Sequence, residues 1–238
     1  MKNKRIWLTG ASRGIGLETA KLLAKKGLTL FLSASSPDSF KPVISQFKEF
    51  ENIFFYPCDI SDSNEVKNTY SKIQKLHQGV DILINNAGIG IFRSFLDTTE
   101  DDFDETIAVN LKGAFLCTKA VLPGMLKNKN NPMIINILSV ATKKVFTGTV
   151  AYSTSKSALL TMSRVLREEV RTYGIKIIDI IPGATETDMW NAEIRQKYRV
   201  DMMQPVDIAK VIVNTIELNI EKRLITEEVL IRPIGGDL

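Results

Sequence analysis

The chain has 238 residues, of which 44% are hydrophobic and 24% charged, and its formal net charge is +4. This balance is typical of a soluble globular protein and argues against a disordered chain or a basic nucleic-acid-binding surface. The basic start is followed by an apolar stretch that ends at Thr9, and no apolar run approaches the roughly 18 residues of a membrane span, so we expect a cytoplasmic protein without membrane partners.

Short β-branched runs alternate along the chain with stretches of helical length. This alternation predicts βα units, and therefore a parallel sheet with helices on both faces. The expected fold class is α/β, with one doubly wound, seven-stranded sheet in a single domain over residues 1–238. We expect the strands at Arg5–Thr9, Thr29–Ser33, Ile53–Tyr56, Asp81–Ile84, Met133–Leu138, Lys176–Ile181 and Val229–Ile231.

One long interval, residues 187–204, has no clear strand character. It lies between the end of the sixth expected strand and a helix that starts near Pro205, so we take it as a candidate substrate lid.

Cysteine and histidine are too scarce and too scattered for several kinds of chemistry. Cys58 and Cys117 have no CxxC spacing and no neighbouring histidine, so we expect buried free thiols and no metal site. His77, the single histidine, lies in a polar helical stretch, and we expect it at the surface. A mechanism that requires a histidine dyad or triad is thereby excluded.

A glycine-rich turn follows the first expected strand and opens directly into a helix. Glycines let the backbone approach a pyrophosphate, while the helix N-terminus supplies free N–H groups and a partial positive charge. The spacing is G-x-x-x-G-x-G, and a turn of this kind also serves as a plain βα connection. The residues of this candidate phosphate site are Gly10, Ser12, Arg13, Gly14, Ile15 and Gly16.

The second expected strand ends without the acidic residue that would bond the ribose hydroxyls of NAD. No acid occurs between the end of this strand at Ser33 and Asp38. Ser35 and Ser36 can donate hydrogen bonds to a 2′-phosphate, and Arg13 can add positive charge. We therefore expect NADP(H) as the cofactor. A plain loop that ends at Pro37 is the alternative explanation of these serines.

Tyr152 and Lys156 lie four residues apart at the start of a stretch with helical periodicity, so their side chains can point to one spot. A phenol has an ordinary pKa of about 10, and a nearby ammonium lowers it. The pair is a candidate proton donor, although an exposed helix pair has the same spacing. Ser139 closes the fifth expected strand, at the edge where such sheets place ligands, and Asn110 lies in a helical stretch before it.

Together these segments resemble the short-chain dehydrogenase/reductase family, in the right order and over nearly the whole chain. The resemblance implies a Rossmann-type fold and an oxidoreductase that transfers a hydride between a nicotinamide and a carbonyl or alcohol carbon. The segments that carry it are the TGASRGIG turn, Asp59, the NNAG segment, Asn110, Ser139, Tyr152, Lys156 and the Pro182-Gly183-x-x-x-Thr187 element.

The resemblance also implies individual roles. Ser139 would hold the substrate oxygen, and Tyr152 would act there as general acid or base. Lys156 would bind the nicotinamide ribose and lower the tyrosine pKa, while Asn110 would anchor a water of a proton relay. Asp59 would bond the adenine amino group, with helix capping as its structural alternative. Cofactor contacts are implied for Asp59, Ile60, Asn86, Ala87, Gly88, Tyr152, Lys156, Pro182, Gly183, Thr185 and Thr187.

Substrate and assembly are constrained less closely. The cofactor-binding half is most similar to 3-oxoacyl-acyl-carrier-protein reductases, but residues 229–238 lack their glycine-rich ending, which argues against an acyl-carrier substrate. Members of the family often form dimers or tetramers, which we expect here by analogy. Apolar residues of the lid and of the loop after Ser139 favour an apolar small-molecule substrate. These residues are Met189, Trp190, Met202, Met203, Val140, Val145 and Phe146.

Two alternatives to an NADP-dependent reductase remain. One is an NAD-linked alcohol dehydrogenase, and the other is a catalytically silent NADP-binding sensor, although a sensor has no need of all four candidate catalytic residues. A serine hydrolase is disfavoured, because Ser139 lacks both a G-x-S-x-G context and a partner histidine.

Overall fold

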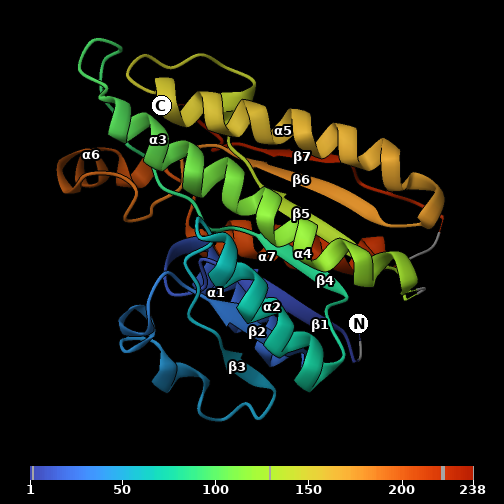
Figure 1. Cartoon of the computed structure of the whole chain (residues 1–238). Helices are drawn as coiled ribbons and strands as arrows, with labels where there is room; N and C mark the ends of the chain where they lie inside the picture. The colour runs from blue at the N-terminus through green and yellow to red at the C-terminus, as the bar shows by residue number, and fades with distance from the viewer. Residues whose placement is uncertain (2, 129, 221–222, 238) are drawn as a thin grey trace.

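A computed structural model describes residues 1, 3–128, 130–220 and 223–237 of the chain. Within this part, all seven strands form one parallel sheet in the order β3-β2-β1-β4-β5-β6-β7 (Figure 1). The expected fold class is confirmed, and every predicted strand end lies within one residue of the observed one. The strands are β1 (Arg5–Thr9), β2 (Thr29–Ser33), β3 (Ile53–Phe55), β4 (Ile82–Asn85), β5 (Met133–Ile137), β6 (Lys176–Pro182) and β7 (Glu228–Ile231).

Helices cover both faces of this sheet, with α1 and α7 on one face and α2, α4 and α5 on the other (Figure 1). A π-helical turn, Ala108–Gly113, joins α3 to α4. The helices are α1 (Gly14–Lys25), α2 (Ser63–His77), α3 (Glu100–Ile107), α4 (Ala114–Lys127), α5 (Val150–Val170), α6 (Ala192–Tyr198) and α7 (Pro205–Asn219). Short 3₁₀ turns lie at Pro37–Phe40, Ile44–Phe47, Val140–Thr142, Arg171–Tyr173 and Arg199–Asp201.

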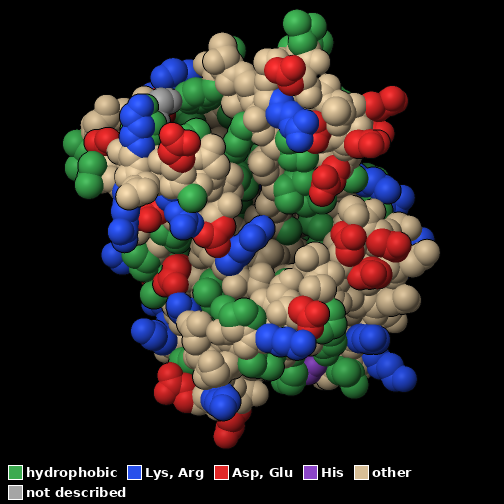
Figure 2. Space-filling model, turned by 90° about the vertical axis from the view of Figure 1, so that its left-hand side faces the viewer, with side chains coloured by type: hydrophobic (Ala, Val, Ile, Leu, Met, Phe, Trp, Pro, Cys, Tyr) green, Lys and Arg blue, Asp and Glu red, His purple; other side chains and the backbone are tan. Residues whose placement is uncertain are grey.

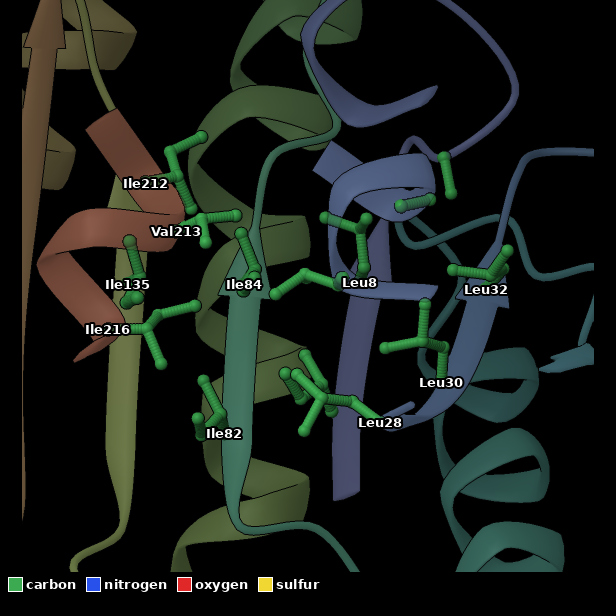
Figure 3. Packing of buried hydrophobic residues seen from close by; sticks show 14 of the residues in the cluster. Leu8, Leu28, Leu30, Leu32, Ile82, Ile84, Ile135, Ile212, Val213 and Ile216 are labelled. Carbon is green, nitrogen blue, oxygen red and sulfur yellow. The ribbon is translucent and has the colours of Figure 1, made fainter. Parts of the chain in front are cut away.

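The strands between the two edges of the sheet are buried on both sides, which explains why they read as continuous apolar runs rather than as alternating patterns. In β1, Leu8 belongs to the core under α1 and α7, and Trp7 belongs to the core under α2 and α4. Figure 3 shows the first of these cores, in which Ile84 of the sheet lies beside Val213 of α7 and Leu8 lies on the other side of Ile84. Burial of each such side chain contributes about 1.5–3 kcal/mol, so this packing holds the strand ends in place.

The order of the strands reverses between β1 and β4, because the chain runs from β1 toward β3 on one side and from β4 toward β7 on the other. Sheets of this kind bind ligands in the crevice outside the carboxyl ends of the strands at this point. The glycine turn follows β1 and Asn86 follows β4, so both border the crevice. No helix in the described part of the chain has the length and hydropathy that a bilayer span requires.

His77 is not the surface residue that we expected. Its ring centre lies 4.3 Å from that of Phe54 and 4.8 Å from that of Phe31, and its Nε2 atom lies 3.2 Å from the Tyr56 hydroxyl. The last turn of α2 lies over these strand residues, which the polar helical pattern could not reveal. Burial lowers the pKa of His77. Cys58 and Cys117 are buried free thiols, as predicted.

Candidate active site

The glycine turn between β1 and α1 is tied to the end of β4. The side-chain amide of Asn86 donates to the backbone oxygens of Thr9 and Gly10, at 3.0 Å each. The Thr9 hydroxyl in turn accepts the N–H groups of Asn86 and Ala87, both at 3.1 Å. Gly10 has a φ of 64°, and a Cβ atom at Gly16 would lie 2.1 Å from the Gly10 oxygen. Both positions therefore require glycine, and the two strand ends are locked together.

Helix α1 begins at this turn with an open N-terminus. Arg13 is the N-cap residue in an extended conformation, no described side chain caps the first turn, and that turn contains no acid. Helix α2 differs, because Asp62 caps it by accepting the N–H groups of Asn64 and Glu65. An uncapped helix N-terminus beside a close glycine backbone fits a phosphate group. The residues present thus fit a dinucleotide cofactor.

The end of β2 lies beside the same turn. The N–H of Ala11 donates to the Ser33 oxygen at 3.0 Å. Ser35 is exposed there, and the Ser36 hydroxyl lies 3.0 Å from the Ser39 hydroxyl. The predicted 2′-phosphate residues are thus next to the glycine turn.

The segment that follows β6 reaches the glycine turn from the other side. A Cβ atom at Gly14 would lie 3.3 Å from Cγ2 of Thr187. The Thr185 hydroxyl donates to the Gly183 oxygen at 3.0 Å, and the Gly183 N–H donates to Ile231 at 2.7 Å. The last of these bonds anchors the segment to β7, so its approach to α1 is fixed by the sheet.

Asp59 forms a local turn and does not cap α2. Its Oδ1 atom accepts the N–H and the hydroxyl of Ser61, at 2.9 and 2.8 Å. The capping alternative is therefore wrong, because Asp62 has that function. The adjacent Ile60 packs so closely on Gly113 that a Cβ atom there would lie 2.5 Å from Cδ1 of Ile60. This contact joins the end of β3 to the start of α4.

Asn110 is buried in the π-helical turn, a feature that is frequent at functional sites. Its Oδ1 atom accepts the Ile89 N–H at 2.8 Å, and its Nδ2 atom donates to the Ile89 oxygen at 2.9 Å and to Ser155 at 3.0 Å. A Cβ atom at Gly88 would lie 3.2 Å from Oδ1 of Asn110 and 3.4 Å from Nζ of Lys156. The structure thus brings Asn110, Gly88 and Lys156 together.

Lys156 is buried beside Tyr152 on α5. Its Nζ atom donates to the Ile137 oxygen at 2.8 Å and lies 5.8 Å from the centre of the Tyr152 ring. Burial lowers the pKa of Lys156 to about 8. The spacing correctly placed both residues at one spot, but the hydrogen bond to Ile137 had no signal in the sequence.

The Ser139 side chain lies close enough to the Tyr152 phenol to act on the pKa of that phenol. Burial raises the pKa of Tyr152, and the Ser139 side chain offsets part of that increase. Burial is the larger of these two effects, so the net shift of the Tyr152 pKa is upward. The Ser139 hydroxyl also accepts the Ala141 N–H at 3.2 Å, which holds it at the end of β5.

A row of buried polar side chains crosses the sheet beneath these residues. Asn85, Asn136 and Asp179 occupy matching positions of β4, β5 and β6. Nδ2 of Asn85 donates a hydrogen bond to Oδ1 of Asn136 at 2.9 Å, and Nδ2 of Asn136 donates one to Oδ1 of Asp179 at 3.1 Å. Ser163 and Arg167 of α5 both bond to Asp179, at 2.6 and 2.7 Å. The row therefore fixes α5 against the strand that carries Ser139.

The predicted lid is more ordered than the sequence indicated. It contains α6, and its end pairs with the strand-end segment, because the Met203 N–H donates to Ala184 at 3.0 Å. Val140 and Met202 are buried, whereas Val145 is 92% exposed. Of the expected apolar residues, Met189 comes close to the backbone of Gly90, where a Cβ atom would lie 2.9 Å from its Cγ.

Sequence reasoning missed Phe92, in the loop after β4. Its ring centre lies 5.6 Å from that of Tyr152 and 5.9 Å from that of Trp190. An aromatic residue shortly after a strand end was the available signal. Figure 2 shows the face of the molecule that carries α6 and the loop after β4, and this face is hollowed near its middle, with hydrophobic side chains around the hollow.

Comparison with known proteins gives a consistent picture. The family model described as short chain dehydrogenase matches residues 4–198. A sepiapterin reductase of Chlorobaculum tepidum is 31% identical over 239 residues, covering 97% of this chain and 96% of the relative. An uncharacterized oxidoreductase of Staphylococcus aureus is 30% identical over 230 residues, covering 95% of this chain and 96% of its own length.

A solved structure of an alcohol dehydrogenase has the same fold as this chain. It is the alcohol dehydrogenase from the archaeon Thermococcus sibiricus, complexed with 5-hydroxy-NADP. That structure superposes with a TM-score of 0.88 at 25% identity and covers 100% of this chain and 99% of its own.

Proposed function

Because this chain belongs to the short-chain dehydrogenase family, we propose that it is an NADP(H)-dependent reductase of an apolar carbonyl compound. The observation that carries this proposal is the grouping of Ser139, Tyr152, Lys156 and Asn110 at the crevice beside the glycine turn. When bound, the nicotinamide supplies the hydride for the carbonyl carbon or accepts it from the alcohol.

The cofactor would lie along the carboxyl ends of β1, β2 and β4. The glycine turn and the open N-terminus of α1 would hold its pyrophosphate. Arg13, Ser35 and Ser36 would bind a 2′-phosphate, since all lie by the turn and residues 33–36 include no acid that would repel that charge. The alcohol dehydrogenase from Thermococcus sibiricus, whose structure contains an NADP derivative, supports the same choice.

Other cofactor contacts follow from positions around the crevice. Asp59 and Ile60 would contact the adenine end, and Asn86, Ala87 and Gly88 the central ribose. The segment after β6 approaches the glycine turn through Thr187, and it would hold the carboxamide and pyrophosphate. These contacts are Pro182, Gly183, Thr185 and Thr187.

In reduction, the phenol of Tyr152 donates its proton to the substrate oxygen, and Ser139 donates a hydrogen bond to the same atom. Burial favours this direction, because a raised pKa keeps Tyr152 protonated at neutral pH. The two donors stabilise the negative charge that develops on the oxygen, an effect worth about 100- to 1,000-fold in rate per donor.

Lys156 and Asn110, which lie next to Tyr152 and Gly88, support this proton transfer. At pH 7 a group with a pKa of about 8 is mostly protonated, and the ammonium of Lys156 stabilises the phenolate that remains. Lys156 would also bind the nicotinamide ribose. Asn110 fixes the backbone of Ile89 with two hydrogen bonds, and so holds the segment after β4 at a constant distance from Lys156.

Substrate closure and assembly belong to the same proposal. Residues 187–204 would close over the substrate, since this segment already contacts both the glycine turn and the loop after β4.

Outward-facing apolar side chains on α4 and α5, such as Phe115 and Val165, support a dimer or tetramer formed through these helices. We place the protein in the cytoplasm.

The proposal is tested by incubating the purified protein with NADPH or NADH and a panel of ketones, quinones and thioesters, followed at the nicotinamide absorbance. We expect turnover of an apolar ketone with NADPH. Tyr152→Phe should lower turnover by about 100- to 10,000-fold while NADPH still binds. Tyr173→Phe, at an exposed position in the 3₁₀ turn after α5, is the matched control and should retain full activity.

Other outcomes would overturn it. NADPH binding without turnover of any member of the panel would favour a sensor, and turnover with NADH alone would favour an NAD-linked dehydrogenase.

A further inference from the structure

Three aromatic rings from separate segments line up at the proposed proton donor, and we call Tyr152, Phe92 and Trp190 the aromatic wall. The rings of Phe92 and Tyr152 meet at 69° with their centres 5.6 Å apart. Those of Phe92 and Trp190 are stacked, with an angle of 26° and a centre distance of 5.9 Å. The proton donor therefore forms the inner end of a continuous aromatic surface.

The local backbone holds this wall in place. The indole N–H of Trp190 donates to the Thr185 oxygen at 3.0 Å, and this bond sets the orientation of the ring. Gly90 lies behind Phe92, where a Cβ atom would come within 2.7 Å of Cζ of Phe92. Glycine is therefore required for the ring of Phe92 to lie this close to the chain. Phe92 is 40% exposed, so part of its ring remains open to a ligand.

Six charged side chains in the segments that flank the wall form three ion pairs. The pairs are Arg93 with Asp102, Asp188 with Arg195, and Glu186 with Arg199. A charged substrate would have to compete with these ion pairs, whereas an uncharged one would not. The surroundings of the wall thus favour an uncharged substrate.

We propose that the aromatic wall selects substrates whose reacting carbonyl is attached to a flat, conjugated ring. The ring stacks on Phe92 and Trp190 while the carbonyl oxygen reaches the Tyr152 hydroxyl. Aromatic rings prefer offset-stacked or edge-to-face contacts with centres 4.5–7 Å apart, and the wall already shows both arrangements. A saturated ring of the same size buries a similar area but gains no such contact. The proposal deepens the proposed function and rests on it.

The chemical step is the proposed reduction. A hydride from NADPH forms the new bond at the carbonyl carbon, the carbon–oxygen double bond becomes single, and the proton of Tyr152 goes to the oxygen. NADPH is oxidised to NADP⁺, and the product is an alcohol attached to the flat ring.

The test compares two amides whose carbonyls are not reduced, benzamide and cyclohexanecarboxamide, by calorimetric titration of the NADP⁺-loaded protein. We expect benzamide to bind about three- to tenfold more tightly. Phe92→Leu and Trp190→Leu should each bring the ratio close to one, and Phe92→Tyr, which keeps the ring, should preserve it. Phe95→Leu is the matched control, because Phe95 lies on the same loop, 78% exposed and outside the wall.

Equal affinities in the unaltered protein, or a preference that survives in both leucine variants, would overturn the proposal. Because the titration requires no turnover, it is separate from the ketone panel. A protein that prefers benzamide but reduces no ketone would contradict the proposed function alone, and one that reduces ketones without this preference would contradict the aromatic wall alone.

Discussion

The ammonium of Lys156 lies 5.8 Å from the centre of the Tyr152 ring, yet its hydrogen bond goes to the backbone of Ile137. The two side chains share a buried environment that acts on them in opposite directions. Burial raises the pKa of the phenol and lowers that of the ammonium to about 8. Each effect disfavours the charged form, and each has a measurable consequence.

The two directions of the reaction should depend differently on pH. Alcohol oxidation requires the phenolate of Tyr152, whose pKa is raised, so its rate should increase with pH by about tenfold per unit below that pKa. Ketone reduction uses the protonated phenol and should vary little from pH 6 to 8, then fall as Lys156 loses its proton near pH 8. Initial rates in both directions across this range are the measurement.

Ser139→Ala offers a check on this assignment. The Ser139 side chain lowers the pKa of Tyr152, so its removal should move the oxidation profile to higher pH. A shift to lower pH would contradict the assignment of that profile to Tyr152.

Lys156→Met should stabilise the protein in the absence of cofactor while it abolishes activity. The folded pKa of about 8 lies below the ordinary value of 10.5, so the unfolded state binds more protons between these values. The stability of the unaltered protein therefore increases with pH across that window, and the full cost of the buried charge is present below it. We expect a gain of about 1–2 kcal/mol at pH 7, after loss of the bond to Ile137.

The measurement for Lys156→Met is urea unfolding at pH 7 and at pH 9.5, where the gain should be smaller. Lys67→Met, on the exposed face of α2, is the control and should change little at either pH. A variant that is less stable than the unaltered protein at pH 7 would show that the charge is not penalised.

Arg13→Ala should distinguish the two nicotinamide cofactors. A guanidinium at the N-cap of α1 can make charge-assisted hydrogen bonds to a 2′-phosphate but gains little from a hydroxyl. We expect NADPH to bind about tenfold more weakly to the variant, with NADH affinity nearly unchanged. Fluorescence titration with both cofactors measures this, and Lys25→Ala at the other end of α1 is the control. Equal losses for both cofactors would exclude a phosphate contact.

Arg167→Met should be strongly destabilising, because it leaves the buried carboxylate of Asp179 without its cation. We expect a loss of about 3–5 kcal/mol at pH 7. Burial already raises the pKa of Asp179 above its ordinary value, so the folded state retains a proton that the unfolded state releases. The loss should therefore grow as pH increases from 4 and shrink as it falls toward 4.

Chemical denaturation at pH 4.5 and pH 7 measures that effect. Adding Asp179→Leu to Arg167→Met should recover much of the stability at pH 7, because no buried charge remains. Arg171→Met is the control, since its ion pairs with Glu168 and Glu227 are exposed. A loss that is independent of pH would assign the effect to packing alone.

The strands and the order of the candidate site residues could be predicted because they depend on local patterns. A run such as Ile82 to Ile84 is apolar since both of its faces are buried, and glycines such as Gly10 and Gly16 mark a turn that no other residue fits. The four-residue spacing of Tyr152 and Lys156 likewise required only helical geometry.

Contacts between distant segments could not be predicted in the same way. Phe92 meets Tyr152 and Trp190 because two loops and the first turn of α5 converge at one edge of the sheet. His77 is half-buried because the end of α2 crosses Phe54, a contact that the polar character of its own helix conceals. Such contacts depend on where the elements pack, and the spacing of residues in one amino-acid sequence does not indicate them.

The amino-acid pattern alone was enough to establish a parallel α/β sheet, a glycine turn suited to phosphate, and a tyrosine and lysine on one helix face. Packing in three dimensions was needed to establish that burial sets the direction of the Tyr152 pKa shift. The physical reason is that spacing along a helix reports which side chains are neighbours, whereas a pKa depends on the solvent that all surrounding elements exclude.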